Sequence, residues 1–483
     1  MAEIQYAGEY QIEVCEIYAS SGTVLDLKDQ FASVNIYEDI FKNALTGDIS
    51  IVDTNNLLTN LPIIGQEKLK LRLVTPNVND DSTRGFAIDF TDTPLYIYKV
   101  DSKVGINDNT FAYTLSFTTP EAVRSNRIRI TQAFDGEPSE DIVKKIFRDE
   151  ELLNSKKELY YEMTSNNFKF VAPNMRPFDF INSVSKRCLS KEYNYAPTFL
   201  FYETIKGFWF RTIDSMMDTK NPRFVYKEET PNILPEGHKK PDVNTTLTNL
   251  LSYSLSSSTD VMMNMRKGMY ASNLLMIDLV NKTVENFNYN YFDNFEEDKH
   301  VDEYNNYGSQ NAPLGSERKD EYNKRLSDYD TSKIYMQAVD REAPNGLFSA
   351  RHDGQYDYTG TDIWLQRRMG RFTAMQSAIT LRITVPGNTT LQAGDMVGID
   401  MRNQGLLAED ERDPIYSGRY LVSKLKHEFT RGDGVYKHNV HMEVIRDTAS
   451  QPFSDKGVPL TDNGNPIDVI VPTGSEDAGD ITY

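Results

Sequence analysis

The chain has 483 residues and a formal net charge of -19, with 71 Asp and Glu residues against 52 Lys and Arg residues. This acidic balance argues against broad, sequence-independent binding to DNA, because such binding depends on cations that neutralise phosphates. A wall that repels DNA is compatible with it. The length exceeds the size at which one hydrophobic core stops growing, so we expect several domains. The 28 Tyr and 24 Phe residues favour strands and large contact surfaces.

Cysteine usage and hydropathy give little sign of secretion. Cys15 and Cys188 are the only two cysteines in the sequence, too few for a disulfide framework or a CxxC metal site, so we expect unpaired core thiols. Residues 1–10 lack a basic region followed by an apolar stretch, and no run approaches the ~18 apolar residues of a membrane span. We therefore expect the protein to be made in the cytosol.

The first part of the chain contains a series of short strand-like stretches. Apolar or alternating stretches separated by turn residues such as Ser21-Gly22 and Asn107-Asp108-Asn109 are typical of a small antiparallel barrel or sandwich. The stretches lie at residues 11–18, 31–37, 47–52, 68–74, 86–90, 95–102 and 111–118. We therefore predict a first β-barrel domain over residues 1–118.

After residue 118 the pattern becomes mixed. Pro138-Ser139-Glu140-Asp141 predicts the start of a helix, since a cap and first-turn acids precede apolar positions. A second helix is expected after Pro177, and residues 198–212 predict a hairpin that holds Trp209. Proline-rich residues 227–244 predict a linker. Residues 119–247 are thus interpreted as an α+β domain with its linker.

A second β unit is predicted to be split by an insertion. Residues 274–290 predict a hairpin, and after a predicted helix at 362–378 the chain returns to strands. Between these, residues 285–351 are crowded with Tyr, Asn, Asp and Glu and contain Gly and Pro breakers. We therefore assign residues 248–290 and 372–446 to a second, discontinuous barrel and residues 291–371 to an inserted module. The later strands are expected at residues 379–385, 396–401, 416–429 and 435–445.

The strongest hairpin signal turns at residues 430–434. In its second strand, period two places Tyr436, Val440, Met442 and Val444 on one face and Lys437, Asn439, His441 and Glu443 on the other. The remaining residues, 447–483, are rich in Gly, Pro, Ser and Asp. Such a composition cannot offset its own ordering entropy, so we expect an extended tail that neighbouring protein holds in place.

The histidines of this hairpin are the first candidates for chemistry. His438 and His441 resemble a metal pair, but three residues apart on a strand they point to opposite faces. His427 beside Glu428 resembles a base with its orienting acid, yet adjacent strand residues also point apart, and the motif has no nucleophile. We interpret these histidines as packed or interfacial side chains.

Other motifs of catalysis are missing from the sequence. It contains no GxSxG, HExxH or GxxxxGK[ST] pattern. The acidic runs Glu296-Glu297-Asp298 and Glu409-Asp410-Glu411 lack EF-hand spacing, so we interpret them as solvated loops. We predict no catalytic residues, no metal ligands and no cofactors, and we expect the chain not to be an enzyme.

One basic cluster stands out in this acidic sequence. Arg367, Arg368 and Arg371 lie close together and form either a solvated helix face or a contact with an acidic surface on another subunit. We carry these arginines forward as candidate intersubunit or partner contacts, together with Asp447 and Tyr483 at the two ends of the tail.

Three C-terminal segments together resemble a known pattern. They are LQAGDMV at residues 391–397, YSGRYLV at 416–422 and LKHEF at 425–429, followed by a final alternating strand. This combination resembles the central hub subunit of the baseplate of contractile-tailed, T-even-like bacteriophages, and also the related late control D proteins and type VI secretion spikes. In that family the last barrel reads L-x-x-G-D/x-V, then G-x-Y-x-V-x-x-x-x-H, then an alternating strand. The sequence departs from the T-even hub in a longer insertion near residues 286–360 and in the polar tail.

The resemblance implies a β-rich α+β, multidomain fold with two similar antiparallel tube-type β-barrels, an α+β domain and an inserted module. It implies a homotrimeric ring of six similar units that adapts a hexameric tail tube to a trimeric central spike and permits genome passage. Implied partners are the tube or tube-initiator protein, the central spike, and baseplate wedge and tape measure proteins, with DNA only in transit. The implied location is the virion tail baseplate, after assembly in the host cytoplasm.

Two other interpretations stay open. The hub of a bacterial contractile injection system would have the same architecture. A tail-associated glycan-binding module or hydrolase is also compatible with the Tyr-rich acidic stretch at residues 289–329, because tyrosines stack on sugars. For a hydrolase, two carboxylates ~5 to 10 Å apart in one cleft would be the discriminating feature.

Overall fold

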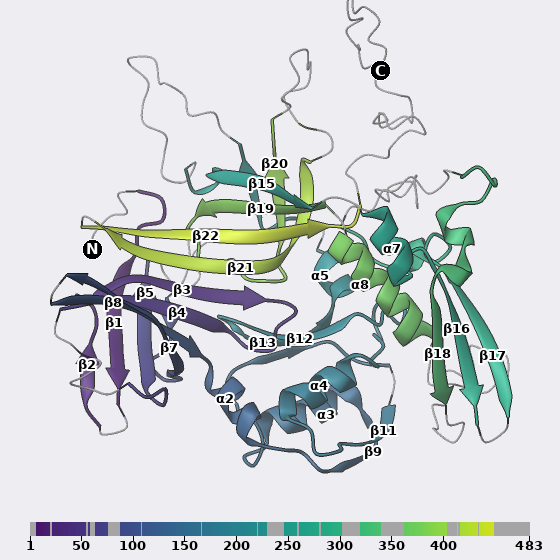
Figure 1. The fold of residues 1–483 in the computed structure, drawn as a ribbon, viewed down its shortest axis with the longest axis horizontal. Helices are drawn as coiled ribbons and strands as arrows, with labels where there is room; N and C mark the ends of the chain where they lie inside the picture. Colours follow the sequence, from purple (N-terminus) through teal and green to yellow (C-terminus); the bar gives the residue numbers. More distant parts are fainter. Residues whose placement is uncertain are drawn as a thin grey trace, which may run out of the picture.

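The structure of the chain, a computed structural model, is β-rich with few helices, and its main feature is a 14-stranded sheet (Figure 1). Among the helices of the described part, none is long and apolar enough to cross a membrane. The structure describes residues 6–19, 22–54, 57, 63–75, 87–107, 109–165, 167–219, 221–228, 246–257, 260–279, 282–301, 319–339, 362–377, 379–402, 413, 416–432 and 434–448.

The first eight strands form one part of this sheet, here called the N-terminal unit. Its neighbours pair antiparallel in the order β3-β4-β8-β7-β5-β1-β2, with β6 on β5. Alternate residues such as Val34 and Ile36 are fully buried, as a strand with one wet face requires. The strands are β1 (Gln11–Tyr18), β2 (Val24–Asp26), β3 (Phe31–Asp39), β4 (Thr46–Asp53), β5 (Lys68–Val74), β6 (Ile88–Asp89), β7 (Leu95–Asn107) and β8 (Thr110–Thr118).

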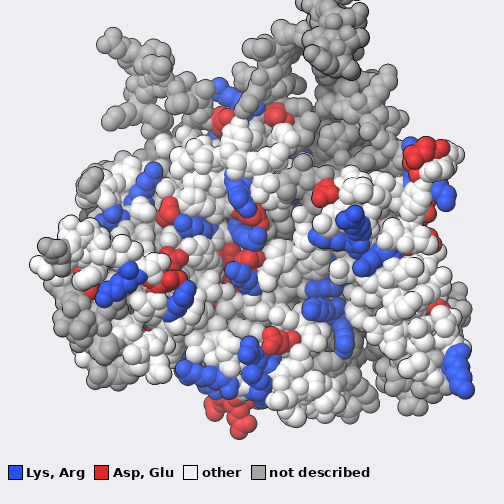
Figure 2. Space-filling view, viewed as in Figure 1, with Lys and Arg blue, Asp and Glu red and all other residues white. Residues whose placement is uncertain are grey.

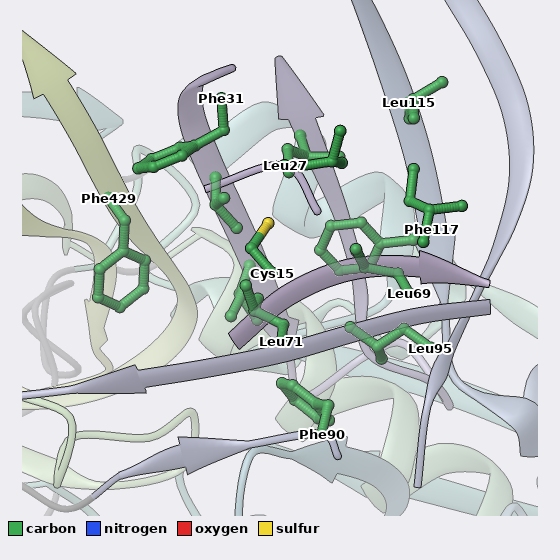
Figure 3. Packing of buried hydrophobic residues seen from close by; sticks show 14 of the residues in the cluster. Cys15, Leu27, Phe31, Leu69, Leu71, Phe90, Leu95, Leu115, Phe117 and Phe429 are labelled. Atoms are coloured by element: carbon green, nitrogen blue, oxygen red, sulfur yellow. The ribbon is translucent and has the colours of Figure 1, made fainter. Parts of the chain in front are cut away.

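The core of the N-terminal unit receives one residue from the far end of the chain. Figure 3 shows Cys15, Leu71 and Phe117 gathered in this core, with Phe429 entering it from the C-terminal hairpin. Phe429 also meets Tyr10 edge-on, with 5.0 Å between ring centroids. Burial raises the pKa of the Cys15 thiol to about 12, so Cys15 acts as a small apolar side chain, as the sequence led us to expect.

Six later strands form the C-terminal unit. Within it the pairing order is β15-β19-β22-β21-β20-β14, and Lys227 links the two ends, since its N–H donates to Thr248 O and its C=O accepts from Leu250 N–H. The unit has its own apolar core, which includes Tyr420, Val422 and Val440. Its strands are β14 (Phe224–Lys227), β15 (Ser252–Ser257), β19 (Ile379–Pro386), β20 (Met396–Asp400), β21 (Gly418–Gly432) and β22 (Val435–Arg446).

One antiparallel strand pair joins the two units into a continuous sheet. Strand β21 pairs with β3 in a register that runs from Lys424 opposite Asp39 to Thr430 opposite Ser33. In Figure 1 the strands β22, β21, β3 and β4 accordingly lie side by side across the molecule. The two units therefore share one sheet while each keeps its own core.

The α+β part lies below this sheet in Figure 1. The predicted helix at Pro138-Ser139 is confirmed by α3, the helix after Pro177 by α4, and the Trp209 hairpin by β12 and β13. The amphipathic face of α3 packs into a core with Phe180 and Phe208. The elements are α2 (Pro120–Arg127), β9 (Ala133–Pro138), α3 (Ser139–Arg148), β10 (Leu159–Tyr161), β11 (Asn167–Val171), α4 (Pro177–Ser185), β12 (Phe199–Thr204), β13 (Gly207–Thr212) and α5 (Ile213–Met217).

The hairpin predicted at residues 274–290 exists, but the structure corrects its place. It forms β16 and β17 of a separate three-stranded sheet, because β18, from the predicted insertion, pairs parallel to β16. Leu274 and Met276 pack there against Phe287, Tyr335 and Leu365 instead of entering the C-terminal unit. Strands β14 and β15 take the place foreseen for this hairpin, and β14 comes from the segment assigned to the α+β domain.

This sheet and the helices beside it form the right-hand part of Figure 1. The tail interpretation lies outside the described residues, apart from Asp447 and Thr448. The remaining elements are α7 (Val261–Lys267), β16 (Ala271–Asp278), β17 (Thr283–Asn290), η1 (Phe295–Glu297), η3 (Leu326–Asp328), η4 (Asp330–Ser332), β18 (Ile334–Val339), η5 (Asp362–Arg367) and α8 (Arg368–Ser377).

Candidate functional site

The shared sheet has one hydrophilic face that crosses from the C-terminal unit into the N-terminal unit, here called the polar face. Period two sends apolar residues of β3, β4, β21 and β22 into the two cores and leaves polar residues on the opposite side. Strand register, which sequence alone does not give, decides which polar side chains become neighbours. The polar face comprises Ser33, Asn35, Tyr37, Asp39, Asp48, Ser50, Arg382, Thr384, Lys424, Lys426, Glu428, Asn439, His441 and Glu443.

A row of alternating charge runs across four adjacent strands of this face. In register, Arg382 of β19 lies opposite Glu443 of β22, Glu443 opposite Lys424 of β21, and Lys424 opposite Asp39 of β3. Lys424 Nζ is 2.6 Å from Glu443 Oε1, and Arg382 Nε is 3.7 Å from Glu443 Oε2. Directly opposed unlike charges stabilise a strand pair. Both ion pairs lie within the C-terminal unit, and the row leaves Lys424 already paired where it faces Asp39 across the junction of the two units.

The next residues along β21 repeat this pairing. Lys426 Nζ donates to Glu428 Oε1 at 2.7 Å, and His441 Nε2 donates to Glu428 Oε2 at 3.0 Å. Partial burial opposes the charge on Glu428, but the bonds from Lys426 and His441 outweigh burial and lower its pKa. Thr384 Oγ1 lies 3.1 Å from His441 Nδ1 and completes a chain over three strands.

On the N-terminal unit the polar face continues with the Asp48 carboxylate, which accepts hydrogen bonds from neutral donors. Asn35 Nδ2 donates to Asp48 Oδ1 at 2.8 Å, and Tyr37 Oη donates to Asp48 Oδ2 at 2.7 Å. Ser50 Oγ and Thr114 Oγ1 are 3.3 Å apart across the next strand pair. This part of the face is therefore held by short hydrogen-bonded groups across β3, β4 and β8.

A concavity of about 720 Å³ lies where the two units meet on this face. Its lining includes Lys42 and Tyr37 of the N-terminal unit and Arg382, Lys426 and Glu443 of the C-terminal unit. In Figure 2 basic and acidic side chains lie next to one another over the strands of the large sheet, without a broad region of one sign. Although the whole chain carries a charge of -19, this face is locally balanced.

One buried carboxyl group connects three parts of the chain beneath the polar face. Glu38 of β3 is 1% exposed and accepts hydrogen bonds from Ile205 N–H at 2.7 Å and from Ala393 N–H at 2.8 Å. Burial is the largest influence and raises the pKa of Glu38 to about 8, although both N–H groups oppose the shift. Glu38 thus fixes the α+β part and the C-terminal unit to β3.

The residues behind the sequence resemblance have structural roles. Gly394 has φ +89°, and a Cβ there would lie 2.5 Å from Tyr202 Oη. Its N–H donates to Val422 O at 2.8 Å, so the LQAGDMV segment folds over the start of β21. Tyr420 is fully buried, and its hydroxyl donates to Tyr416 O. These positions shape the junction between the C-terminal unit and the α+β part.

The three histidines lie as the strand period predicts. His427 and His438 are buried and in contact, with Nδ1 of His427 3.1 Å from Nε2 of His438, whereas His441 belongs to the polar face. Burial lowers the pKa of His427 to about 3 and that of His438 well below its usual value. In the described parts of the chain, no group of three or more His, Cys, Asp or Glu residues is placed to hold a metal ion.

The predicted contact residues Arg367, Arg371 and Asp447 come together, but inside the chain. Arg371 and Asp447 are fully buried and 3.1 Å apart, and Arg367 Nη2 is 2.6 Å from Asp298 Oδ1. The interpretation of a surface contact gives way to an internal ion cluster, because both arginines meet carboxylates of their own chain and Asp447 meets Arg371 and His300. Asp298, one of the residues interpreted as a solvated loop, is likewise buried.

Arg368 has a related internal role. Its guanidinium donates to Ser185 O at 3.4 Å and Phe199 O at 3.1 Å, so it fixes α8 to the α+β part. Burial lowers its pKa to about 10.

Tyr483 and the acidic run at residues 409–411 lie outside the described residues. Sequence reasoning predicted the polar side of β22, with Asn439, His441 and Glu443, but missed its continuation onto β21, where charged side chains at alternate positions, Lys424, Lys426 and Glu428, were the available signal.

Comparison with known proteins gives likenesses in structure alone. No protein-family model and no curated protein sequence matches the chain. The chain is similar to a tail protein from Neisseria meningitidis MC58, at 10% identity and a TM-score of 0.48, with 91% of this chain and 97% of that chain covered. It is similar to the 43 kDa tail protein of prophage MuSo2 from Shewanella oneidensis, at 9% identity and a TM-score of 0.49, with 90% and 98% covered.

A more distant likeness is to the E. coli c3393 protein, described as a component of the type VI secretion system. The identity is 9% and the TM-score 0.39, with 94% of this chain and 79% of that chain covered. At such values we rest the functional proposal on the chain's own residues.

Proposed function

We propose that this chain is a structural hub subunit of a contractile tail. Three copies form a ring whose two β units per chain present six similar surfaces. The ring joins a hexameric tube above to a trimeric spike below, and the polar face lines the central passage. The chain acts mechanically in this role and makes or breaks no covalent bond.

The observation that carries the proposal is the continuous sheet. Two β units with separate cores are joined by the pairing of β3 with β21, and the polar face crosses their junction without a break. A wall that surrounds a passage needs such a surface, since backbone groups are paired and polar side chains meet water. The motif segments of the resemblance fold at this junction, where Ala393 bonds to Glu38.

Symmetry explains why two units in one chain are useful. Closed rings bury repeated contacts on every subunit and leave no free edge. Three chains with two β units each offer a pseudo-six-fold rim, so a six-fold tube can make the same kind of contact six times. The α+β part and the three-stranded sheet remain as three-fold features that suit a trimeric spike.

The mass and symmetry of the purified full-length chain test this proposal. Light scattering should give three times the 55.3 kDa of the chain, and electron-microscopic class averages should show a ring with a central opening and a pseudo-six-fold rim. A concentration series guards against dissociation on dilution. A chain that stays monomeric at high concentration, or a ring without three-fold symmetry, would sink the hub assignment.

A further inference from the structure

We infer that Glu428 and Glu443 keep the lysines of the polar face from holding a passing polyanion such as double-stranded DNA. This inference rests on the proposed role of the face as the wall of a passage. Each of the two carboxylates lies within hydrogen-bond distance of a lysine Nζ, at 2.7 Å for Lys426 and 2.6 Å for Lys424. A phosphate would have to displace these partners before either lysine could bind it.

The strand register places each of the two glutamates next to its lysine. Glu443 lies directly opposite Lys424 and beside Arg382, and Glu428 lies two residues along β21 from Lys426, on the same side of the strand. His441 adds a second donor to Glu428 at 3.0 Å. Because both glutamates extend from strands of the sheet, each stays close to its lysine when a ligand passes.

Pairing has a different effect from a uniformly acidic wall. A polyanion gains affinity when free cations of the protein neutralise its phosphates and release the counterions condensed on it, so log affinity falls with log salt with a slope of about -0.9 for each phosphate neutralised. A lysine already neutralised by a fixed carboxylate releases little when a phosphate approaches. A strongly acidic wall would instead repel the polyanion at the entrance. The polar face thus lets DNA approach without retaining it.

The proposed test frees the lysines without altering the shape of the face. In the double variant E428Q/E443Q both carboxylates become amides of the same size, which removes the ion-pair partners of Lys424, Lys426 and Arg382. Binding of a labelled 30-base-pair duplex would be followed by fluorescence polarisation, beginning at about 50 mM salt, where phosphate contacts contribute strongly. We expect at least about tenfold tighter binding than for the natural chain, with a salt slope steeper by roughly 2 to 3, about 0.9 for each of the three cations that lose a carboxylate partner, Lys424, Lys426 and Arg382.

Two controls separate pairing from net charge. The variant E150Q/E151Q raises the net charge by the same amount at exposed positions of the α+β part, and should leave DNA affinity unchanged. The variant E428Q/E443Q/R382Q/K424Q/K426Q, which removes all three cations together with their carboxylate partners, should return to the natural affinity. Equal effects from both double variants, or tight binding by the natural chain, would overturn the inference.

Failure of this inference is distinguishable from failure of the ring. Each variant would be weighed by light scattering alongside the binding measurement. If the chain is a trimer and its E428Q/E443Q variant gains no affinity for DNA, the proposed role of the two glutamates is contradicted, whereas the hub proposal stands. A monomer that gains DNA affinity would retain the pairing and overturn the hub role.

Discussion

Arg371 of α8 donates a hydrogen bond to Asp447 at the end of β22, with 3.1 Å between Nη1 and Oδ2, and both side chains are fully buried. Asp298 and Asp214 also approach the same guanidinium, at 3.4 and 3.5 Å. Burial opposes the charge on Arg371, but these carboxylates outweigh burial and raise its pKa. One arginine thus joins α5, the segment after β17, α8 and the start of the C-terminal tail.

Replacing Arg371 by Met should therefore destabilise the fold strongly. The change leaves Asp214, Asp298 and Asp447 buried without their shared cation, and breaking a buried ion pair costs roughly 3–5 kcal/mol. Thermal unfolding of the full chain would show the loss. Arg382→Met offers a matched control, because Arg382 is 66% exposed and an exposed pair contributes only about 0–1 kcal/mol. Equal effects of the two changes would contradict the assigned role.

Glu38 should make stability fall as the pH rises from about 4.5 to 8. Its pKa is raised from 4.5 to about 8 in the folded chain, mainly by burial, so its contribution is fully present below pH 4.5 and is lost through pH 8. Gln in its place accepts only one of the two backbone N–H bonds. We expect Glu38→Gln to be less stable than the natural chain at pH 5, with the difference narrowing by pH 8. Denaturant unfolding of both proteins at several pH values measures the difference in their free energies of unfolding. A difference that stays constant with pH would refute the prediction.

His427 should give the opposite dependence at acid pH. Because burial lowers its folded pKa from 6.5 to about 3, the neutral ring contributes stability above pH 6.5 that is lost as the pH falls toward 3. His427→Gln keeps a polar group next to His438 but does not titrate. We expect the variant to lose less stability than the natural chain between pH 7 and pH 5. Denaturation midpoints at these two pH values suffice, and equal losses would argue against the buried neutral ring.

Local sequence patterns predicted where helices and strands lie far better than which strands pair with one another. The β21–β22 hairpin, its two faces and the helices after Pro138 and Pro177 followed from period and capping signals within a few residues. The hairpin at residues 274–290 was also found, but its neighbour was wrong. The residue pattern of the hairpin does not specify its neighbour, because any strand or core that covered the same apolar residues would satisfy the alternation.

The functional surfaces depend on register and on distant contacts. The row from Arg382 to Asp39 requires the β3–β21 pairing, which joins opposite ends of the chain. Arg367 and Arg371 were interpreted as a solvated helix face or a contact with another subunit, because their partners in the fold, Asp298 and Asp447, lie about 70 residues away or more. A sequence shows where charges are, but the fold decides which of them are buried together.

Gly394, in the LQAGDMV segment of the resemblance, should not tolerate a side chain. Its φ of +89° disfavours any Cβ, and the added atom would lie 2.5 Å from Tyr202 Oη and 2.6 Å from Arg211 Nη2. Tyr202 cannot move aside easily, because it is fully buried and its hydroxyl accepts from Arg211 Nε at 2.9 Å. We therefore expect Gly394→Ala to cost about 1 kcal/mol for the backbone and roughly 1–3 kcal/mol more for overpacking.

Gly434, in the β21–β22 turn, supplies the matched control. Its φ is +78°, similar to that of Gly394, but a Cβ there would meet nothing within 4 Å. Gly434→Ala should therefore show only the backbone cost of about 1 kcal/mol. The difference between the two variants in thermal unfolding isolates the contact between the motif and the α+β part. If Gly394→Ala and Gly434→Ala lose the same stability, Gly394 is needed only for its backbone conformation, and its close approach to Tyr202 does not contribute to the junction.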